Sequence, residues 1–211
     1  MVQSESRRTQ IQQALLAKAD QLWAAYDTFS VVMEDASKNY EARQTVNEQG
    51  LTCTMIKYRA DGLTLEQLEQ WRQDPTNIAV QMNSKLTREL LPDDEGHKVV
   101  LLKIKMPMVI SNRSTVTCFY EAEKEDGTKI VMSSSQGNES ITTDNAAKIG
   151  KDVVANSVIS YTSYKPYDGG IELQQLVEND PCGSIPAFMK NKGAKRAANN
   201  LLNMVNYLQT G

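Results

Sequence analysis

Apolar residues recur at helical spacing near both ends of the chain. The stretch from about Thr9 to Tyr26, with Leu15 among its apolar positions, predicts an amphipathic helix. Near the other end, Ser184 can cap a helix and Pro186 fits its first turn, where proline costs no hydrogen bond. The apolar positions that follow predict one stripe about seven turns long: Ile185, Phe188, Met189, Ala194, Ala198, Leu201, Leu202, Val205 and Leu208.

Between these helices, short runs of strand-forming residues are separated by turn residues. Residues 29–62 predict short strands, and 64–73 a helix that opens with a capping box of Thr64 and Gln67. Residues 77–91 fit either a helix or a strand, and residues 93–98 predict a hairpin turn. Five further strands are predicted: Val99–Met106, Thr115–Glu123, Lys129–Ser135, Val153–Tyr164 and Ile171–Glu178.

The order of these elements indicates a single α+β domain. No repeat, low-complexity stretch or linker divides the chain, so we predict one domain over residues 15–211 after an N-terminal polar extension, residues 1–14. A long apolar stripe on the last helix has to be buried, and a curved antiparallel sheet is the surface available for it. Apolar periodicity alone does not distinguish this from a plain core helix.

Composition excludes several classes of protein. The chain has 211 residues and a net charge of −3, which favours a sizeable core and does not favour nucleic-acid binding. Residues 1–10 are polar, and no apolar run approaches the roughly 18 residues of a membrane span. The three cysteines are few, scattered and odd in number, so we expect a reducing compartment and a cytoplasmic protein.

The residues that carry catalysis are sparse. His97 is the only histidine and lies in a turn, and Cys118 has no histidine to serve as its base. No phosphate-binding glycine loop and no close cysteine pair occurs, so we expect neither a metal nor a cofactor. Glu121 and Tyr161 are the remaining weak candidates for an ionisable pair inside a cavity.

Two motifs point to a known family. Residues 104–116, IKMPMVISNRSTV, resemble a proline-rich strand end leading into Ser-Asn-Arg-Asp. Residues 180–191, DPCGSIPAFMKN, resemble an Asn-Pro-x-Gly-x-Ile-Pro turn that opens a last helix. Together they resemble the START (StAR-related lipid transfer) family over roughly residues 15–211, with the phosphatidylcholine-transfer branch as the nearest.

This resemblance implies a helix-grip fold, in which a curved antiparallel sheet wraps around the long C-terminal helix and encloses an apolar tunnel. The implied function is that of a lipid-binding or lipid-transfer protein that holds one hydrophobic ligand. The C-terminal helix would close the tunnel. Arg113 of the first motif is expected to be structural, fixing the strand end to a backbone or carboxylate partner.

The chain departs from the head-group contacts of its nearest branches. Phosphatidylcholine binders place an Arg just before a Trp-Asp pair, and the matching position near Met82-Asn83 has no such Arg. Their aromatic sites for choline fall on Leu102, Thr115 and Ile159, none of which is aromatic. The sterol-binding branch carries an Arg where this chain has Phe119.

Because an isolated charge is costly to bury, a tunnel without a cation predicts a neutral ligand such as a sterol, a carotenoid or other isoprenoid, or diacylglycerol. A phospholipid of the phosphatidylcholine type is the alternative, and an enzyme of the wider helix-grip fold is the third possibility. The residues expected to line the tunnel are Leu102, Ile104, Met106, Thr115, Thr117, Phe119, Met132, Ile159, Tyr161, Leu173, Phe188, Met189, Leu201 and Leu202.

One strand leaves two choices of face. Residues 115–123 alternate between two faces of the strand, and apolar periodicity alone would turn Val116 and Cys118 toward the protein interior. The resemblance instead implies that Thr115, Thr117 and Phe119 point toward the tunnel, and we expect this second orientation.

Four basic residues gather on the outer side of the last helix: Lys190, Lys192, Lys195 and Arg196. Near an anionic membrane surface each could contribute roughly 1 kcal/mol. We therefore expect a monomeric protein whose last helix touches membranes transiently, while an ordinary solvated helix face is the alternative.

Overall fold

A computed structural model of the chain describes residues 5–36, 39–73, 85–107, 110–185 and 193–210. For residues 71–73, 194, 196, 198 and 210 it describes the backbone alone.

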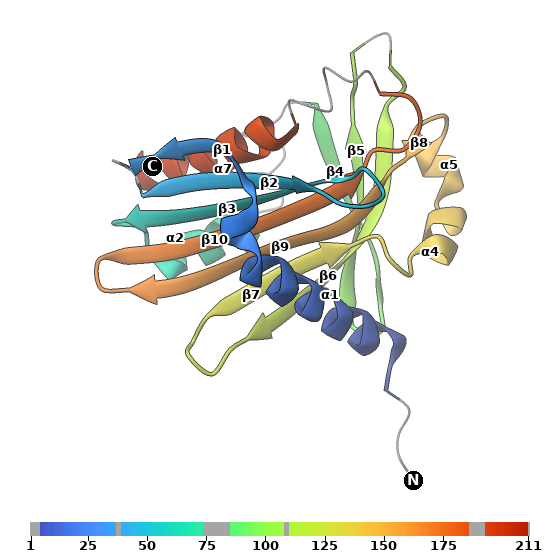
Figure 1. The fold of residues 1–211 in the computed structure, drawn as a ribbon. Helices are drawn as coiled ribbons and strands as arrows, with labels where there is room; N and C mark the ends of the chain where they lie inside the picture. Colours follow the sequence, from blue (N-terminus) through green and yellow to red (C-terminus); the bar gives the residue numbers. More distant parts are fainter. Residues whose placement is uncertain (1–4, 37–38, 74–84, 108–109, 186–192, 211) are drawn as a thin grey trace.

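The described strands form one ten-stranded sheet (Figure 1). Its order is β1-β2-β3-β10-β9-β7-β6-β5-β4, with neighbours antiparallel throughout, and the short β8 pairs in parallel with β6. The strands are β1 Ser30–Asp35, β2 Tyr40–Val46, β3 Thr52–Asp61, β4 Leu86–Asp94, β5 His97–Ile104, β6 Arg113–Glu123, β7 Lys129–Ser134, β8 Val153–Val154, β9 Asn156–Tyr167 and β10 Gly170–Asp180.

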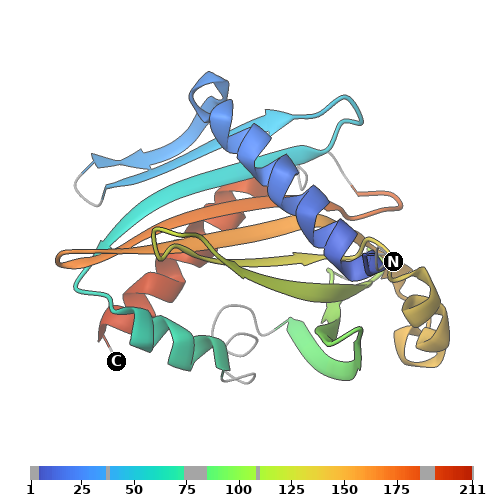
Figure 2. The same ribbon diagram turned by 90° about the horizontal axis from the view of Figure 1, so that it is seen from below.

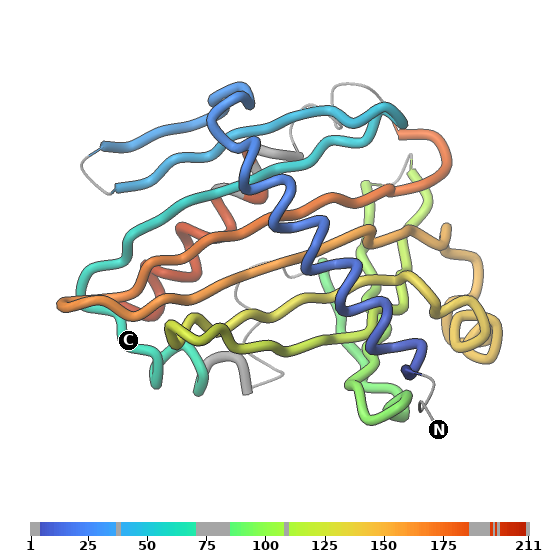
Figure 3. Tube along the Cα trace, turned by 60° about the horizontal axis from the view of Figure 1, so that its bottom comes forward, coloured from blue at the N-terminus to red at the C-terminus, as the bar shows by residue number. Residues whose placement is uncertain are grey.

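Two helices of 18 residues lie on opposite faces of this sheet. Helix α1 (Arg7–Ala24) crosses one face, which we call the outer face, and α7 (Gly193–Thr210) lies behind the other, the inner face (Figures 2 and 3). The smaller helices are η1 Tyr26–Thr28, α2 Leu65–Gln73, α4 Glu139–Asp144 and α5 Ala146–Ile149. The antiparallel sheet and its C-terminal helix confirm the predicted α+β helix-grip fold.

The outer face is closed by α1. Ile11, Leu15 and Ala19 of this helix are buried against alternate residues of the strands. The strand side chains in this cluster are fully or almost fully buried: Cys53, Met55, Leu91, Val99, Leu101, Val116, Cys118, Tyr120, Ile130, Met132, Ile159, Tyr161 and Leu176. Since Ile11 belongs to this cluster, the core begins before residue 15, where the resemblance placed the start of the domain.

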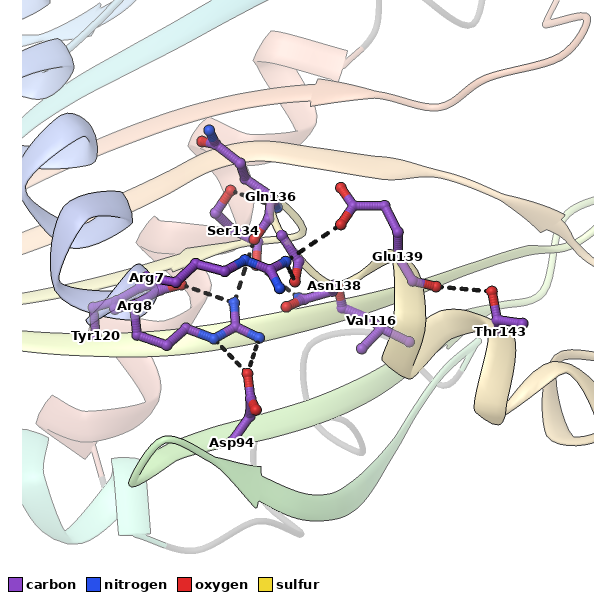
Figure 4. A network of polar contacts seen from close by, with 11 residues as sticks. Arg7, Arg8, Asp94, Val116, Tyr120, Ser134, Gln136, Asn138, Glu139 and Thr143 are labelled. Carbon is purple, nitrogen blue, oxygen red and sulfur yellow. Dashed lines mark hydrogen bonds and ion pairs between the residues drawn. The ribbon is translucent and has the colours of Figure 1, made fainter. Parts of the chain in front are cut away.

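A buried polar network anchors the start of α1 to the sheet (Figure 4). The Arg8 side chain is fully buried and pairs with Asp94, its Nε lying 2.6 Å from Asp94 Oδ2. Its Nη1 donates to Tyr120 Oη at 3.3 Å and to the carbonyl of Gln136 at 3.4 Å. Burial alone would lower the pKa of Arg8, but the hydrogen bonds to Asp94 and Tyr120 outweigh burial and raise it.

The inner face is packed by α7 at the end of the sheet nearest β3. Helix α7 contacts β1, β3 and α2. Its Leu201, Met204 and Val205 join an apolar cluster with strand and α2 residues: Tyr40, Ala42, Ile56, Tyr58, Ala60, Leu63, Leu68, Tyr164, Ile171 and Leu173. This part of the inner face is therefore ordinary core.

Several local predictions are confirmed. The capping box forms, with the Gln67 N–H donating to Thr64 Oγ1 at 3.2 Å and the Thr64 N–H donating to Gln67 Oε1 at 2.9 Å. The N-terminal helix and the five strands after residue 98 form within a few residues of their predicted bounds. The ambiguous stretch becomes a strand from Leu86 onward, while residues 74–84 lie outside the described residues.

Candidate functional site

The same strands differ in burial on their two faces. On β9, the outer-face residues Ile159 and Tyr161 are 0% and 2% exposed. Their neighbours Ser160 and Thr162, which point to the inner face, are half-buried. The pattern repeats on β7, where Met132 is buried and Ser133 half-buried. The inner face between β5 and β10 is therefore less completely covered than the outer face.

Strand β6 turns the residues favoured by the resemblance toward the inner face. Val116, Cys118 and Tyr120 belong to the cluster under α1, so Thr115, Thr117 and Phe119 point the opposite way. The face is the one that the resemblance implied rather than the one from simple periodicity, and the role of these residues in lining a tunnel stays a prediction. Both faces of the strand are covered, so apolar side chains occur on the outer face as well.

Most of the expected tunnel residues within the described chain lie on the inner side. Leu102 and Ile104 pair with Thr115 and Arg113, and both point to the inner face. Leu173 of β10 is fully buried in the cluster beside α7. Leu201 and Leu202 of α7 belong to or pack against this cluster, and Met106 is half-buried just after β5. Phe188 and Met189 lie outside the described residues.

Three expected tunnel residues lie on the other face. Met132, Ile159 and Tyr161 belong to the cluster covered by α1. Met132 and Tyr161 are register partners across β7 and β9, so strand alternation turns both toward the outer face. The prediction that these three residues face the C-terminal helix is therefore wrong. The resemblance matches positions along the sequence and does not specify which face of a strand each residue occupies.

Arg113 joins the two motifs of the sequence. Its Nε donates to the Pro181 carbonyl at 2.7 Å and its Nη2 to the Cys182 carbonyl at 3.0 Å, while Nη1 donates to the Ser111 carbonyl. The Arg113 residue is only 3% exposed. The guanidinium thus holds the end of β10 against the start of β6, which confirms the expected structural role.

The structure adds a cation that the sequence did not indicate. Arg88 of β4 pairs with Leu102, which pairs with Thr115, so the three residues form one row on the inner face. Its guanidinium carbon lies 5.4 Å from the centroid of the Phe119 ring. Its Nε is buried and has no hydrogen-bond partner among the described residues. Burial lowers the pKa of Arg88, and no neighbouring group offsets that shift.

Two threonine hydroxyls on the inner face of β6 are also without hydrogen-bond partners among the described residues. Thr115 Oγ1 and Thr117 Oγ1 are buried, and in the described part of the chain neither atom has a hydrogen bond. Thr117 lies between Thr115 and Phe119 on the same face of β6. We call Arg88, Thr115, Thr117 and Phe119 the Arg88 cluster.

Other candidate chemistry does not come together. Tyr161 points to the outer face and Glu121 to the inner side of β6, so they cannot form a pair. Burial is the main cause that raises the pKa of the Cys118 thiol, and the His97 ring contacts Tyr120 at 5.0 Å between centroids. Within the described part of the chain, no group of three or more His, Cys, Asp or Glu residues could hold a metal ion.

The basic residues of the last helix are only partly in view. Lys195 is exposed on α7, whereas Lys190, Lys192 and the Arg196 side chain lie outside what the structure describes. None of the helices in the described ranges is long and apolar enough to cross a membrane.

Comparison with solved structures identifies the fold. No protein-family model and no curated protein matches the sequence. Human StAR-related lipid transfer protein 5 superposes with a TM-score of 0.71 at 15% identity, covering 95% of this chain and 94% of its own. Human STARD10 gives a TM-score of 0.69 at 16% identity, over 85% of this chain and 72% of its own.

A bacterial structure shows the same likeness. The StAR-related lipid transfer protein fragment of Xanthomonas axonopodis has a TM-score of 0.67 at 16% identity, covering 86% of this chain and 99% of its own. The comparisons do not separate the phosphatidylcholine-transfer branch from the others, so that finer resemblance stays a prediction. The chain has the helix-grip fold of the START domains.

Proposed function

We propose that this protein is a soluble, monomeric lipid carrier of the cytoplasm that binds one hydrophobic ligand between the inner face and the C-terminal helix, without a cofactor. The observation that carries the proposal is the contrast between the two faces of the same strands. Side chains under α1 are fully or almost fully buried, whereas a run of inward-facing residues on the same strands, among them Phe119, Ser133 and Ser160, is half-buried. In a START fold, a face of this kind is suited to cover a lipid.

Binding is favoured over catalysis. The two residues that the sequence offered as an ionisable pair, Glu121 and Tyr161, point to opposite faces of the sheet. Cys53 and Cys118 are fully buried on the outer side, so neither thiol faces the proposed ligand. A nucleophile with an adjacent base would be the signature of an enzyme.

The class of lipid depends on one side chain. The sequence favoured a neutral ligand because no cation could be assigned to the tunnel. Arg88 lies on the inner face, and a wholly neutral lipid would leave its charge without a counter-ion. A lipid with an acidic head group is therefore better matched to this face than a sterol or diacylglycerol.

Exchange of the lipid is proposed to take place at a membrane surface, where the basic side chains of the last helix would dock. Lys195 is exposed and supports this role. Reversing the charge at Lys192 and Lys195 together should slow transfer to anionic vesicles several-fold and leave transfer to neutral vesicles unchanged. Equal rates for the variant and the wild type on anionic vesicles would reject docking.

The proposed function is tested by filling the inner face. Ser160 is half-buried there and pairs with Ser133 and Val177. A Ser160→Trp variant should lose binding and transfer of fluorescent lipids between vesicles. Val154→Trp is the matched control, since Val154 is 41% exposed on β8 and should accept the ring.

Thermal unfolding of both variants separates a filled site from a misfolded chain. If wild-type protein bound and moved no lipid from vesicles containing acidic, zwitterionic and neutral lipids, the carrier function would be wrong. Full transfer by a folded Ser160→Trp protein would place the ligand elsewhere on the molecule.

A further inference from the structure

The Arg88 cluster lies at the β4–β5–β6 end of the inner face, away from the part that α7 packs. The sheet order ends with β5 and β4, while α7 contacts β1 and β3 at the opposite end. Arg88, Leu102 and Thr115 stand in register across β4, β5 and β6. The cluster therefore takes its side chains from β4 and β6, with Leu102 of β5 between Arg88 and Thr115.

Arg88, a half-buried residue with a buried Nε, differs from the two arginines that are buried in the described structure. Arg8 pairs with Asp94 and Tyr120, and Arg113 donates to three backbone carbonyls. Arg88 Nε has no hydrogen-bond partner in the described chain. Burial lowers the pKa of Arg88. Arginine side chains nevertheless remain charged in proteins, so this residue cannot avoid the cost by losing its proton.

The Phe119 ring offsets only part of the free-energy cost of burying the Arg88 Nε without a hydrogen-bond partner. A guanidinium 5.4 Å from a ring centroid gains a cation–π attraction with the face of the ring. That contact provides no acceptor for the N–H groups, and buried N–H groups without acceptors are costly. The ring therefore contacts the guanidinium but leaves the buried Nε–H without a hydrogen bond to any described residue.

The neighbouring hydroxyls point to the same missing partner. Thr115 Oγ1 and Thr117 Oγ1 are buried and unpartnered, and a hydroxyl can donate to an oxygen acceptor. A planar guanidinium and two hydroxyl donors on the same face of the sheet match a group that carries several oxygen acceptors and a negative charge. Carboxylate and phosphate are such groups, and arginine binds both with paired hydrogen bonds.

We propose that the Arg88 cluster is an oxyanion site that binds the carboxylate or phosphate head of a lipid. This inference rests on the proposed function as a lipid carrier and names the class of lipid. Arg88 supplies the charge, and Thr115 and Thr117 donate hydrogen bonds to the remaining oxygens.

A row of half-buried side chains leads away from this head-group site. Phe119 pairs with Ser133, Ser133 with Ser160, and Ser160 with Val177, all on the inner face. All four residues are half-buried. The acyl chain of the lipid lies along this row, with its head at β4 to β6 and its tail directed toward β10.

The test compares three fluorescent probes that share one acyl chain and label: a fatty acid, the corresponding lysophosphatidic acid and the fatty alcohol. Affinities are measured by titration of the full chain after its lipid has been removed. The wild type should bind at least one acidic probe about tenfold or more tightly than the alcohol, as expected for charge-assisted hydrogen bonds in a sheltered site. Which acidic probe binds more tightly identifies carboxylate or phosphate as the preferred head.

The decisive variant is Arg88→Gln, which keeps a polar side chain and removes the charge. It should lose the preference for the acidic probe and keep the affinity for the alcohol. Arg59→Gln is the matched control, because Arg59 is exposed and stacks on Tyr167, 3.9 Å from its ring centroid. The control should bind all three probes like the wild type.

Thr115→Val and Thr117→Val provide an independent reading, since valine keeps the shape and removes the hydroxyl. Each substitution should lower the affinity for the acidic probe several-fold and leave the affinity for the alcohol unchanged. These variants decide the question even if Arg88→Gln fails to fold.

Two failures can be told apart. If the wild type binds none of the probes, the carrier function itself fails. If it binds the alcohol as tightly as the acids, or if folded Arg88→Gln retains the acidic preference, the carrier function stands and the oxyanion site is wrong.

Discussion

Two arginines, Arg8 on α1 and Arg88 on β4, show how the surroundings of a positive charge differ between the two faces of the sheet. Arg8 reaches the sheet from α1 and is enclosed with Asp94, Tyr120 and a carbonyl as partners. Arg88 projects from β4 toward the inner face, where its Nε finds no partner among the described residues. Burial opposes the charge in both places, and only Arg8 has groups that outweigh it. Arg8 has its charge partner within the chain, whereas the Nε of Arg88 has no partner among the described residues.

The burial of the other strand side chains repeats this contrast. Under α1, alternate strand residues are buried almost completely. On the inner face the same strands present half-buried Ser133, Ser160 and Thr162. Close packing of the outer face provides stability, and incomplete packing of the inner face leaves surface that a ligand can cover.

The largest expected effect is on the outer face, at Arg8. In Arg8→Met, Asp94 and Tyr120 lose their buried partner, and the free energy of unfolding should fall by about 3 kcal/mol. This lies at the lower end for a broken buried pair because 37% of the Asp94 side chain remains exposed. Urea denaturation measures the loss.

Arg7→Met is the neighbouring control for this prediction. The Arg7 side chain is 52% exposed and its partner Glu139 80%, so the control should lose no more than about 1 kcal/mol. Equal losses for the two variants would contradict the buried role of Arg8.

Leucine truncation compares the apolar surfaces. Leu15 is 3% exposed under α1, so Leu15→Ala should lower the free energy of unfolding by about 3 kcal/mol through loss of contacts and a new cavity. Leu102 is half-buried on the inner face, so Leu102→Ala should cost about 1 kcal/mol.

Lipid binding should show the reverse order. Leu102→Ala should lower the affinity of the protein for the acyl probes. Leu15→Ala should leave these affinities unchanged at temperatures where the variant is folded. A greater effect of Leu15 on lipid affinity would reverse the assignment of the two faces.

Removing the inner-face charge should affect stability least. In Arg88→Met, a half-buried cation whose Nε lacks a partner in the described chain is replaced by an apolar chain, so the lipid-free protein should unfold within about 1 kcal/mol of the wild type, on the more stable side. The variant should then gain less stability from an added acidic lipid than the wild type does. A large loss of stability in the lipid-free variant would mean that Arg88 is a structural residue.

Thiol reactivity tests the closure of the outer face without a mutation. Burial raises the pKa of Cys53 to about 12 and also raises that of Cys118, so both stay protonated and inaccessible at pH 8. Cys182 is partly exposed. One thiol should react with a disulfide reagent in the folded protein and three after unfolding. Rapid reaction of all three in the folded state would contradict a closed outer face.

Much of the fold could be predicted because the local signals agree with it. Apolar periodicity indicated both long helices, the capping box located the start of α2, and turn residues separated most strands. The face of a strand was harder to predict, since β6 is covered on both sides. Alternation then separates Val116 from Thr117 without indicating which of them lies under α1.

Arg88 illustrates why the site itself was missed. The hairpin turn pairs Asp94 with His97, and counting back from it without interruption would place Arg88 opposite Lys103, on the outer face. The register shifts between Leu91 and Asp94, beside Pro92 on an edge strand, and this irregularity turns Arg88 inward opposite Leu102. A one-residue shift reverses the face of every residue beyond it, and sequence alone does not reveal that shift.

The most direct test is mass spectrometry of the organic extract from purified wild-type protein and from Arg88→Gln. We predict that the wild type carries about one lipid per chain with a carboxylate or phosphate head, and that this lipid is absent from the variant or replaced by a neutral one. A stoichiometric neutral lipid in both proteins would contradict the oxyanion site on the inner face.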